Sequence, residues 1–222
     1  MTVSTDPGAT APAAAPVNGA TAGRGNRGLV WVLAALLVGA VLGLGAGLVI
    51  PRFTTPGDTS VEAGFLRDMS THHAQAVEMS MIAHAGSANP EIVTLAGDIA
   101  LTQHGQIGYM QAWLRDWHLS PTSSEEPMAW MPDSAGSVVN GLMPGMATPA
   151  QLDALRKATG KDLDIQFLTL MRQHHLGGIH MAQEVINLSD NKDVTWLAET
   201  MVSGQQGELN LIDALLKKLQ AP

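Results

Sequence analysis

Two pairs of adjacent histidines, each set among methionines, are the residues of this chain whose types and spacing could do chemistry. The first pair lies in FLRDMSTHHAQAVEMSM, residues 65–81, and the second in FLTLMRQHHLGGIHMAQE, residues 167–184. Neutral imidazole and thioether both bind copper, and thioether selects Cu(I) over hard cations. The pattern therefore predicts a site for Cu(I), or for Ag(I), with the candidate ligands Met69, His72, His73, Met79, Met171, His174, His175 and Met181.

The same residues have a second interpretation that needs no metal. Methionine at helical spacing usually fills a hydrophobic core, and a buried imidazole needs a hydrogen-bond partner because an unpaired polar group inside a protein costs free energy. Gln103 and Gln106 lie on the apolar face of the helix predicted after the first histidine pair, Gln205 is the repeat counterpart of Gln103, and Asp68 lies one turn before the first pair. The glutamines and Asp68 are candidate hydrogen-bond partners of the ligands. The alternative to a metal site is a structural or partner-binding bundle with hydrogen-bonded histidines.

Further methionines and a histidine are candidate outer ligands. Met81 and His84 follow the first pair, and the proline-rich connection after the first half contains two Met-x2-Met steps. Because Pro and Gly flank these steps, they predict either exposed thioethers that collect Cu(I) or a loop packed onto the bundle. The residues concerned are Met128, Met131, Met143 and Met146. The unduplicated histidines, His104, His118 and His180, are interpreted as surface residues.

The two histidine segments are copies of one unit. His72 and His174 lie 102 positions apart, and the same offset relates Gln103 to Gln205 without a gap. In each copy apolar residues recur at three- and four-residue steps through two successive segments, which indicates two amphipathic helices. Two helical hairpins with a long connection predict an all-α four-helix bundle with pseudo-twofold symmetry. The predicted boundaries are residues 61–118 for the first hairpin, 119–148 for the connection, and 149–219 for a short helix and the second hairpin.

The short helix has the clearest predicted start. Thr148 is its expected N-cap, Pro149 its first helical residue and Gln151 the partner of Thr148 in a capping box. Gly160 is expected to end it.

The chain before the bundle is interpreted as a disordered cytoplasmic tail (residues 1–28), a transmembrane helix (residues 29–50) and a linker (residues 51–60). The middle segment is apolar and uncharged, and about 20 such residues span a bilayer. A cleaved signal is the competing interpretation, but its apolar region usually runs only about 7–15 residues. Two arginines precede the span and one follows it, which favours a single-pass protein of the cell membrane with an outward-facing bundle. Gly-x3-Gly steps in the span are compatible with a homo-oligomer.

Composition excludes several classes of function. The 222 residues include 12 Met and 8 His but no Cys, so thiolate chemistry is absent. The net charge is −8 and basic residues form no stripe, which disfavours nucleic-acid binding. The sequence contains no Glu-x2-His step of a di-iron site, no Gly-rich phosphate loop and no Gly-x-Ser-x-Gly motif. The sequence therefore does not predict an enzyme.

The motifs resemble those of the domain of unknown function 305 family over residues 61–219. The resemblance rests on Met-x2-His-His-x5-Met in both halves, the glutamine steps at Gln103 and Gln205, Trp113-Leu114, and GMATPAQLDAL before the second hairpin. It implies a ferritin-like bundle, secreted or membrane-anchored, that handles copper outside the cytoplasmic membrane. The second copy departs from the first where Leu176-Gly177-Gly178 replaces Ala74-Gln75-Ala76. The combined hypothesis is a membrane-anchored bundle that binds or buffers Cu(I) or Ag(I).

Overall fold

The computed structural model describes residues 25–132, 134 and 136–221 and divides after Thr54 into two units. The described part of the first unit is one apolar helix, α1 (Gly25–Thr54). Its window Gly28–Gly45 has a mean hydropathy of 2.4 and no buried residue, as expected for either a membrane span or a signal sequence. The helix is longer than the predicted span of residues 29–50 and takes in the start of the predicted linker.

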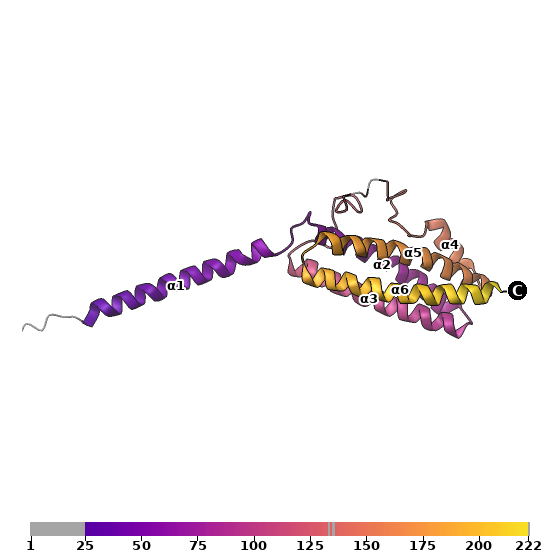
Figure 1. Ribbon diagram of the computed structural model, residues 1–222, viewed down its shortest axis with the longest axis horizontal. Coiled ribbons are helices and arrows are strands. Elements are labelled where there is room, and N and C mark those ends of the chain that lie inside the picture. Colours follow the sequence, from indigo (N-terminus) through magenta and orange to yellow (C-terminus); the bar gives the residue numbers. More distant parts are fainter. Residues whose placement is uncertain (1–24, 133, 135, 222) are drawn as a thin grey trace, which may run out of the picture. The chain divides into compact units, whose positions relative to one another are not determined.

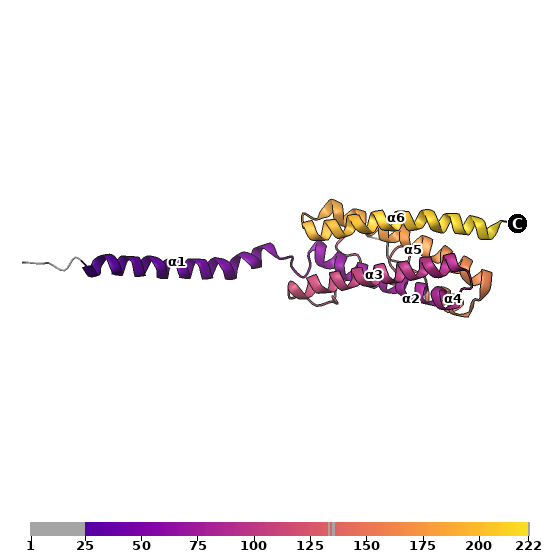
Figure 2. The same cartoon turned by 90° about the horizontal axis from the view of Figure 1, so that it is seen from below.

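The second unit contains five helices. They are α2 (Val61–Gly86), α3 (Pro90–Asp116), α4 (Pro149–Lys157), α5 (Gly160–Leu188) and α6 (Lys192–Gln220). Helix α2 packs on α3, α5 packs on α6, and the two hairpins meet through α2 and α5. Figures 1 and 2 show these four long helices running alongside one another. The predicted all-α, ferritin-like bundle of two duplicated hairpins is confirmed. Of the predicted tail, residues 1–24 lie outside the described residues.

Helix ends follow from capping side chains. The Ser60 side chain accepts from the Ala63 N–H at the start of α2, and Asn89 and Asn191 cap α3 and α6 in the same way. Thr148 and Gln151 form the predicted capping box of α4. Gly160 does not end that helix: α4 stops at Lys157, and Gly160 begins α5 with a positive φ of 57°. Glycine accepts this backbone conformation without a steric penalty.

The pseudo-twofold relation is visible in a reciprocal pair of hydrogen bonds between the two hairpins. The Ser87 hydroxyl after α2 donates to Asp164 of α5 over 2.5 Å. The Ser189 hydroxyl after α5 donates to Glu62 of α2, also over 2.5 Å. Each residue of one bond lies 102 positions from its counterpart in the other. The duplication therefore holds for contacts in space as well as for sequence.

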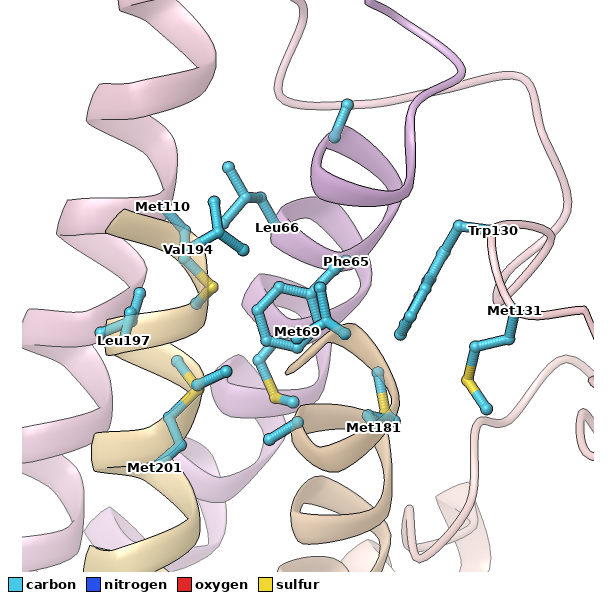
Figure 3. Close-up of a cluster of buried hydrophobic side chains, with 14 of the residues drawn as sticks. Phe65, Leu66, Met69, Met110, Trp130, Met131, Met181, Val194, Leu197 and Met201 are labelled. Atoms are coloured by element: carbon cyan, nitrogen blue, oxygen red, sulfur yellow. The ribbon is translucent and has the colours of Figure 1, made fainter. Parts of the chain in front are cut away.

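The core consists of two hydrophobic clusters along the bundle. The first, shown in Figure 3, surrounds Phe65 and includes Met69 of α2 with Met181 of α5. The second surrounds Phe167 and brings Met79 of α2 together with Met171 of α5. An early residue of one helix thus shares a cluster with a late residue of the other, because α2 and α5 run in opposite directions. The histidine pairs lie between these methionines in both helices.

Residues 119–148, here called the strap, cross the side of the bundle formed by α2 and α5 (Figure 1). The Gln75 amide donates to the Ala147 carbonyl over 2.9 Å and accepts from its N–H over 2.6 Å. At the equivalent position of the second half is Gly177, where any Cβ would overlap the carbonyl of Pro144. The two copies differ here because one strap lies across two symmetric helices. Helix α2 binds the strap through the Gln75 amide, and α5 leaves space for the strap backbone at Gly177.

Gly207→Ala is expected to raise the free energy of unfolding by about 0.5–1 kcal/mol. Gly207 lies inside α6 and is exposed, and a Cβ there would meet nothing within 4 Å. Alanine removes the entropic cost that glycine carries in a helix interior. Denaturant titration followed by tryptophan fluorescence measures the change. A loss of stability would show that this surface of α6 is occupied in the folded protein.

Candidate metal centre

The four paired histidines form a buried layer between the two hydrophobic clusters. The exposed fraction is 0% for His72, His73 and His175, and 1% for His174. The rings of His72 and His174 lie face to face across the two hairpins, with centroids 3.7 Å apart and planes tilted by 34°. The rings of His72 and His73 are 6.5 Å apart. The duplication therefore brings the two histidine pairs together, as expected for residues near a pseudo-twofold axis.

Each imidazole in the layer uses its Nε2 for a hydrogen bond to oxygen. His72 Nε2 lies 3.1 Å from the Pro144 carbonyl, and His174 Nε2 lies 2.9 Å from the backbone carbonyl of His72. Carbonyl oxygens only accept, so both nitrogens carry the proton. His73 Nε2 lies 2.8 Å from Gln106 Oε1, and His175 Nε2 lies 2.6 Å from Glu208 Oε2. All four contacts are consistent with Nε2–H as the donor.

The other ring nitrogen, Nδ1, has no hydrogen-bond partner in any of the four histidines among the described residues. In a neutral imidazole that donates through Nε2, the Nδ1 atom carries an available lone pair. The layer therefore holds four buried acceptors without donors. This arrangement is typical of metal-binding histidines, which donate one ring N–H to an oxygen and bind the metal through the other nitrogen.

Three imidazoles of this layer, those of His72, His73 and His174, have lowered pKa values and are neutral at physiological pH. Burial lowers the pKa of His72 to about 4, with a smaller contribution from repulsion by His175. Burial, followed by repulsion from His72, lowers the pKa of His73 to about 3. Burial also lowers the pKa of His174 well below its ordinary value, and repulsion by the other three histidines adds to this effect. Protons therefore do not compete for the Nδ1 lone pairs near pH 7.

The methionine candidates flank this layer. Met69, Met79, Met171 and Met181 are fully buried. Figure 3 shows Met69 and Met181 in the first cluster, and Met79 and Met171 lie in the second. In the described part of the chain, no group of three or more His, Cys, Asp or Glu side chains is placed to hold a metal ion. A metal in this layer would therefore need imidazole and thioether ligands together.

Gln103 and Gln205 do not bond to the histidine pairs, contrary to expectation. Both are buried, and Gln103 has no partner for either amide atom, while Gln205 Oε1 also has none among the described residues. The partners of His73 and His175 come from the next turn of α3 and α6, at Gln106 and Glu208. Gln106 was expected as a partner together with Gln103, and the repeat offset of 102 from Gln106 could have identified Glu208.

Asp68 does not support the histidines either. Its carboxylate accepts from the Met128 N–H over 2.6 Å and from the Trp130 indole N–H over 2.9 Å. Burial raises the pKa of Asp68, and these two hydrogen bonds partly offset the effect. The residue therefore fixes the strap to α2. This role explains why its repeat counterpart is Leu170, since the strap crosses the bundle only once.

The outer candidate ligands lie away from the histidine layer or within the hydrophobic core. Met128, Met131 and Met143 are buried in the first cluster, and Met146 packs against it. Of the two alternatives for the strap methionines, the structure agrees with packing of the loop onto the bundle. A loop that lies on the bundle needs apolar side chains on the side that faces it. Met81 is 53% exposed. His84 is exposed and lies 2.9 Å from the Val93 carbonyl through Nδ1. As expected, the remaining histidines, His104, His118 and His180, are not buried.

The fold and the histidine layer define a class of protein: duplicated, ferritin-like helical bundles with paired histidines at the hairpin interface. Within this class the chain belongs to the DUF305 family, "Domain of unknown function (DUF305)", whose model matches residues 62–216. The resemblance noted in the sequence is thereby confirmed.

Solved structures agree with this assignment. A Streptomyces coelicolor DUF305 protein, for which secretion is proposed, shares 42% identity over 74% of this chain and 97% of its own, with a TM-score of 0.68. A Deinococcus radiodurans DUF305 fragment shares 29% identity over 73% and 99%, with a TM-score of 0.61. CopM in its Cu(I)-bound form shares 21% identity over 73% and 99%, with a TM-score of 0.57, a likeness of fold alone. No curated protein matches the chain.

Proposed function

We propose that this protein binds a soft monovalent metal ion, Cu(I) or Ag(I), in the histidine layer, and that its function is to bind or buffer the ion rather than to catalyse a reaction. The observation that carries the proposal is the set of four buried Nδ1 atoms without partners beside four Nε2 atoms that all have one. A buried acceptor without a donor costs about 1–3 kcal/mol. A bound cation would remove that cost for each nitrogen that it contacts.

The identity of the ion follows from the chemistry of the available ligands. His72 and His174 are the central candidates because their rings lie 3.7 Å apart, and His73 and His175 lie next to them in sequence. Thioethers flank the layer, whereas cysteine is absent from the chain. Imidazole with thioether favours Cu(I) and its analogue Ag(I) over hard cations. CopM, which shares the fold, has structures with Cu(I), with Ag and with Cu(II), which supports copper or silver as the ion at the level of the fold.

The proposed location is outside the cytoplasmic membrane, with α1 as a retained anchor. The apolar window of α1 is long enough to cross a bilayer and has no buried residue. A relative for which secretion is proposed has the same bundle. Methionine ligands suit such a location because, unlike thiolates, they do not form disulfides. Alkaline extraction of membranes separates a retained anchor, which stays in the pellet, from a cleaved signal, which releases the bundle.

Ag(I) is expected to stabilise the full-length protein in detergent. A ligand that binds only the folded state raises the free energy of unfolding by about 2.7 kcal/mol at one hundred times its dissociation constant. Denaturant titration at increasing Ag(I) measures the effect. The double variant His72→Ala/His174→Ala should lose it, whereas the exposed pair His104→Ala/His180→Ala should keep it.

The central variant could fail to fold, so the wild-type protein needs an independent readout. Nitrogen-15 spectra of its histidine side chains should show Ag(I) shifting Nδ1 and not Nε2. If Ag(I) and Cu(I) changed neither the stability nor these spectra, the layer would be a structural hydrogen-bonding layer and the proposal would be wrong.

A further inference from the structure

The two halves of the histidine layer differ in charge at one pair of equivalent positions. His73 contacts the neutral amide of Gln106 over 2.8 Å, and His175 contacts the carboxylate of Glu208 over 2.6 Å. The side chain of Glu208 is 21% exposed. The His175 Nδ1 has no acceptor nearby among the described residues, so a second ring proton would be unpaired. His175 therefore donates to a carboxylate, whereas His73 donates to an amide.

Several other charged groups on the helices around the layer have partners elsewhere. Arg67 bonds to Asp58, and Asp68 holds the strap. On α5, Arg172 pairs with Asp213 of α6, and Asp164 accepts from Ser87 at the end of the bundle. The strap offers the layer only the carbonyl of Pro144. In the described part of the chain, Glu208 is thus the carboxylate in hydrogen-bond contact with the imidazoles.

We infer that Glu208 sets the charge of the ion that the layer accepts and makes the site selective for monovalent over divalent cations. One carboxylate balances one positive charge, so the loaded layer with Cu(I) or Ag(I) is electrically neutral. A divalent ion would leave one unbalanced charge in a buried site, which is costly. Gln106, at the equivalent position of the other half, is a neutral amide and therefore adds no second negative charge. This inference rests on the proposed function and names the residues that determine its specificity.

The protein supplies its own matched variants for testing this inference. Glu208→Gln gives the second half the residue type that the first half has at the equivalent position, Gln106. The His73–Gln106 pair shows that a glutamine can accept the imidazole N–H in this geometry. Gln106→Glu is the reverse exchange, and the existing pair His175–Glu208 shows that a glutamate fits there as well. Both exchanges are nearly isosteric and lie at partly exposed positions. Glu208 is a positioning residue that acts on the metal through His175.

The experiment measures Ag(I) and Zn(II) affinities of the full-length protein by competition with chelators of known affinity. Glu208→Gln should weaken Ag(I) binding by about 10–100-fold, as is usual for partners of metal-binding histidines. Gln106→Glu should shift the Ag(I)/Zn(II) affinity ratio toward Zn(II) by about tenfold or more, because two carboxylates then balance a divalent ion. Gln206→Glu, which adds the same charge at an exposed position of α6, should leave the ratio unchanged.

Nitrogen-15 spectra of His175 in Glu208→Gln should retain the Nε2–H tautomer, which separates an effect of charge from a structural change. If the wild-type protein binds Ag(I) and both exchanges leave the Ag(I)/Zn(II) ratio unchanged, this inference is overturned and the proposed function stands. If the wild-type protein does not bind Ag(I), the proposed function is overturned and the inference with it.

Discussion

The metal-free protein is expected to lose stability steadily as the pH falls from 6.5 toward 4. The folded state keeps His72 and His73 neutral down to pH values of about 4 and 3, whereas the unfolded chain takes up their protons near 6.5. The unfolded state therefore binds more protons in this window, so acid favours unfolding. Each such histidine contributes a slope of about 1.4 kcal/mol per pH unit. His72 alone would cost roughly 3 kcal/mol by pH 4.

This loss is large compared with the roughly 5–15 kcal/mol that stabilises a typical domain. His174 adds to it, since its pKa is lowered in the same direction. Asp68 acts in the opposite sense: burial raises its pKa, so its folded carboxyl group takes up a proton more readily than the unfolded one. That contribution lies above the ordinary value of 3.8 and opposes that of the histidines.

Denaturant titrations between pH 7 and pH 4, in the presence of a chelator, measure the slope. His73→Gln, whose amide can still donate toward Gln106, should flatten it. His104→Gln, at an exposed position, should not. A stability that stays level from pH 6.5 to 4.5 would show that the layer takes up protons without unfolding, contrary to the burial of its rings.

Gly177→Ala is expected to lower the free energy of unfolding by roughly 3–5 kcal/mol, since it adds overpacking to the loss of a buried hydrogen bond. Its Cβ would overlap the Pro144 carbonyl, and a backbone atom cannot rotate away. The strap would have to lift at the residue that accepts the His72 N–H, leaving that donor unpaired. A Cβ at the neighbouring Gly145 would likewise overlap the Gln173 carbonyl of α5, so the strap backbone has little room to shift here.

Gly178→Ala is the matched control for this effect. A Cβ at Gly178 would meet the amide end of Gln205, 2.7 Å away, and a flexible side chain can move. Gly178→Ala should therefore cost clearly less than Gly177→Ala, measured by denaturant titration of both proteins alongside the wild type. If Gly177→Ala fell within about 1 kcal/mol of the wild type, the strap would not be held against α5 as described.

Sequence reasoning succeeded where the signal is periodic or local. The 102-residue offset and the helical spacing predicted the hairpins and the fold, and local side-chain chemistry predicted the capping box at Thr148. The burial of His72 and His174 followed from their position on the apolar faces of both copies. Periodicity indicates which face of a helix points inward, but it does not indicate which residues that face contacts.

Contacts made by irregular backbone were not predictable in this way. Asp68 was expected near the histidines but bonds to Met128 and Trp130, residues about 60 positions away in a segment without periodicity. The sequence shows that Gly177 replaces the repeat counterpart Gln75. The reason, the close approach of the Pro144 carbonyl, lies in the strap, which has no periodicity. Gln103 and Gln106 were both expected to reach the first histidine pair, and Gln106 does so while Gln103 does not. The apolar stripe ranks residues by burial, whereas hydrogen bonding depends on reach.

The stacking of His72 on His174 has a consequence for the history of the chain. A residue near a twofold axis meets its own copy, so a single hairpin could have built the same layer as a homodimer. In such a dimer each imidazole would donate to the other subunit's backbone carbonyl. Here His174 still donates to the carbonyl of His72, whereas His72 donates to Pro144. In the single chain the connecting peptide thus takes one half of what would be a reciprocal contact in a homodimer, and the two halves need not be identical.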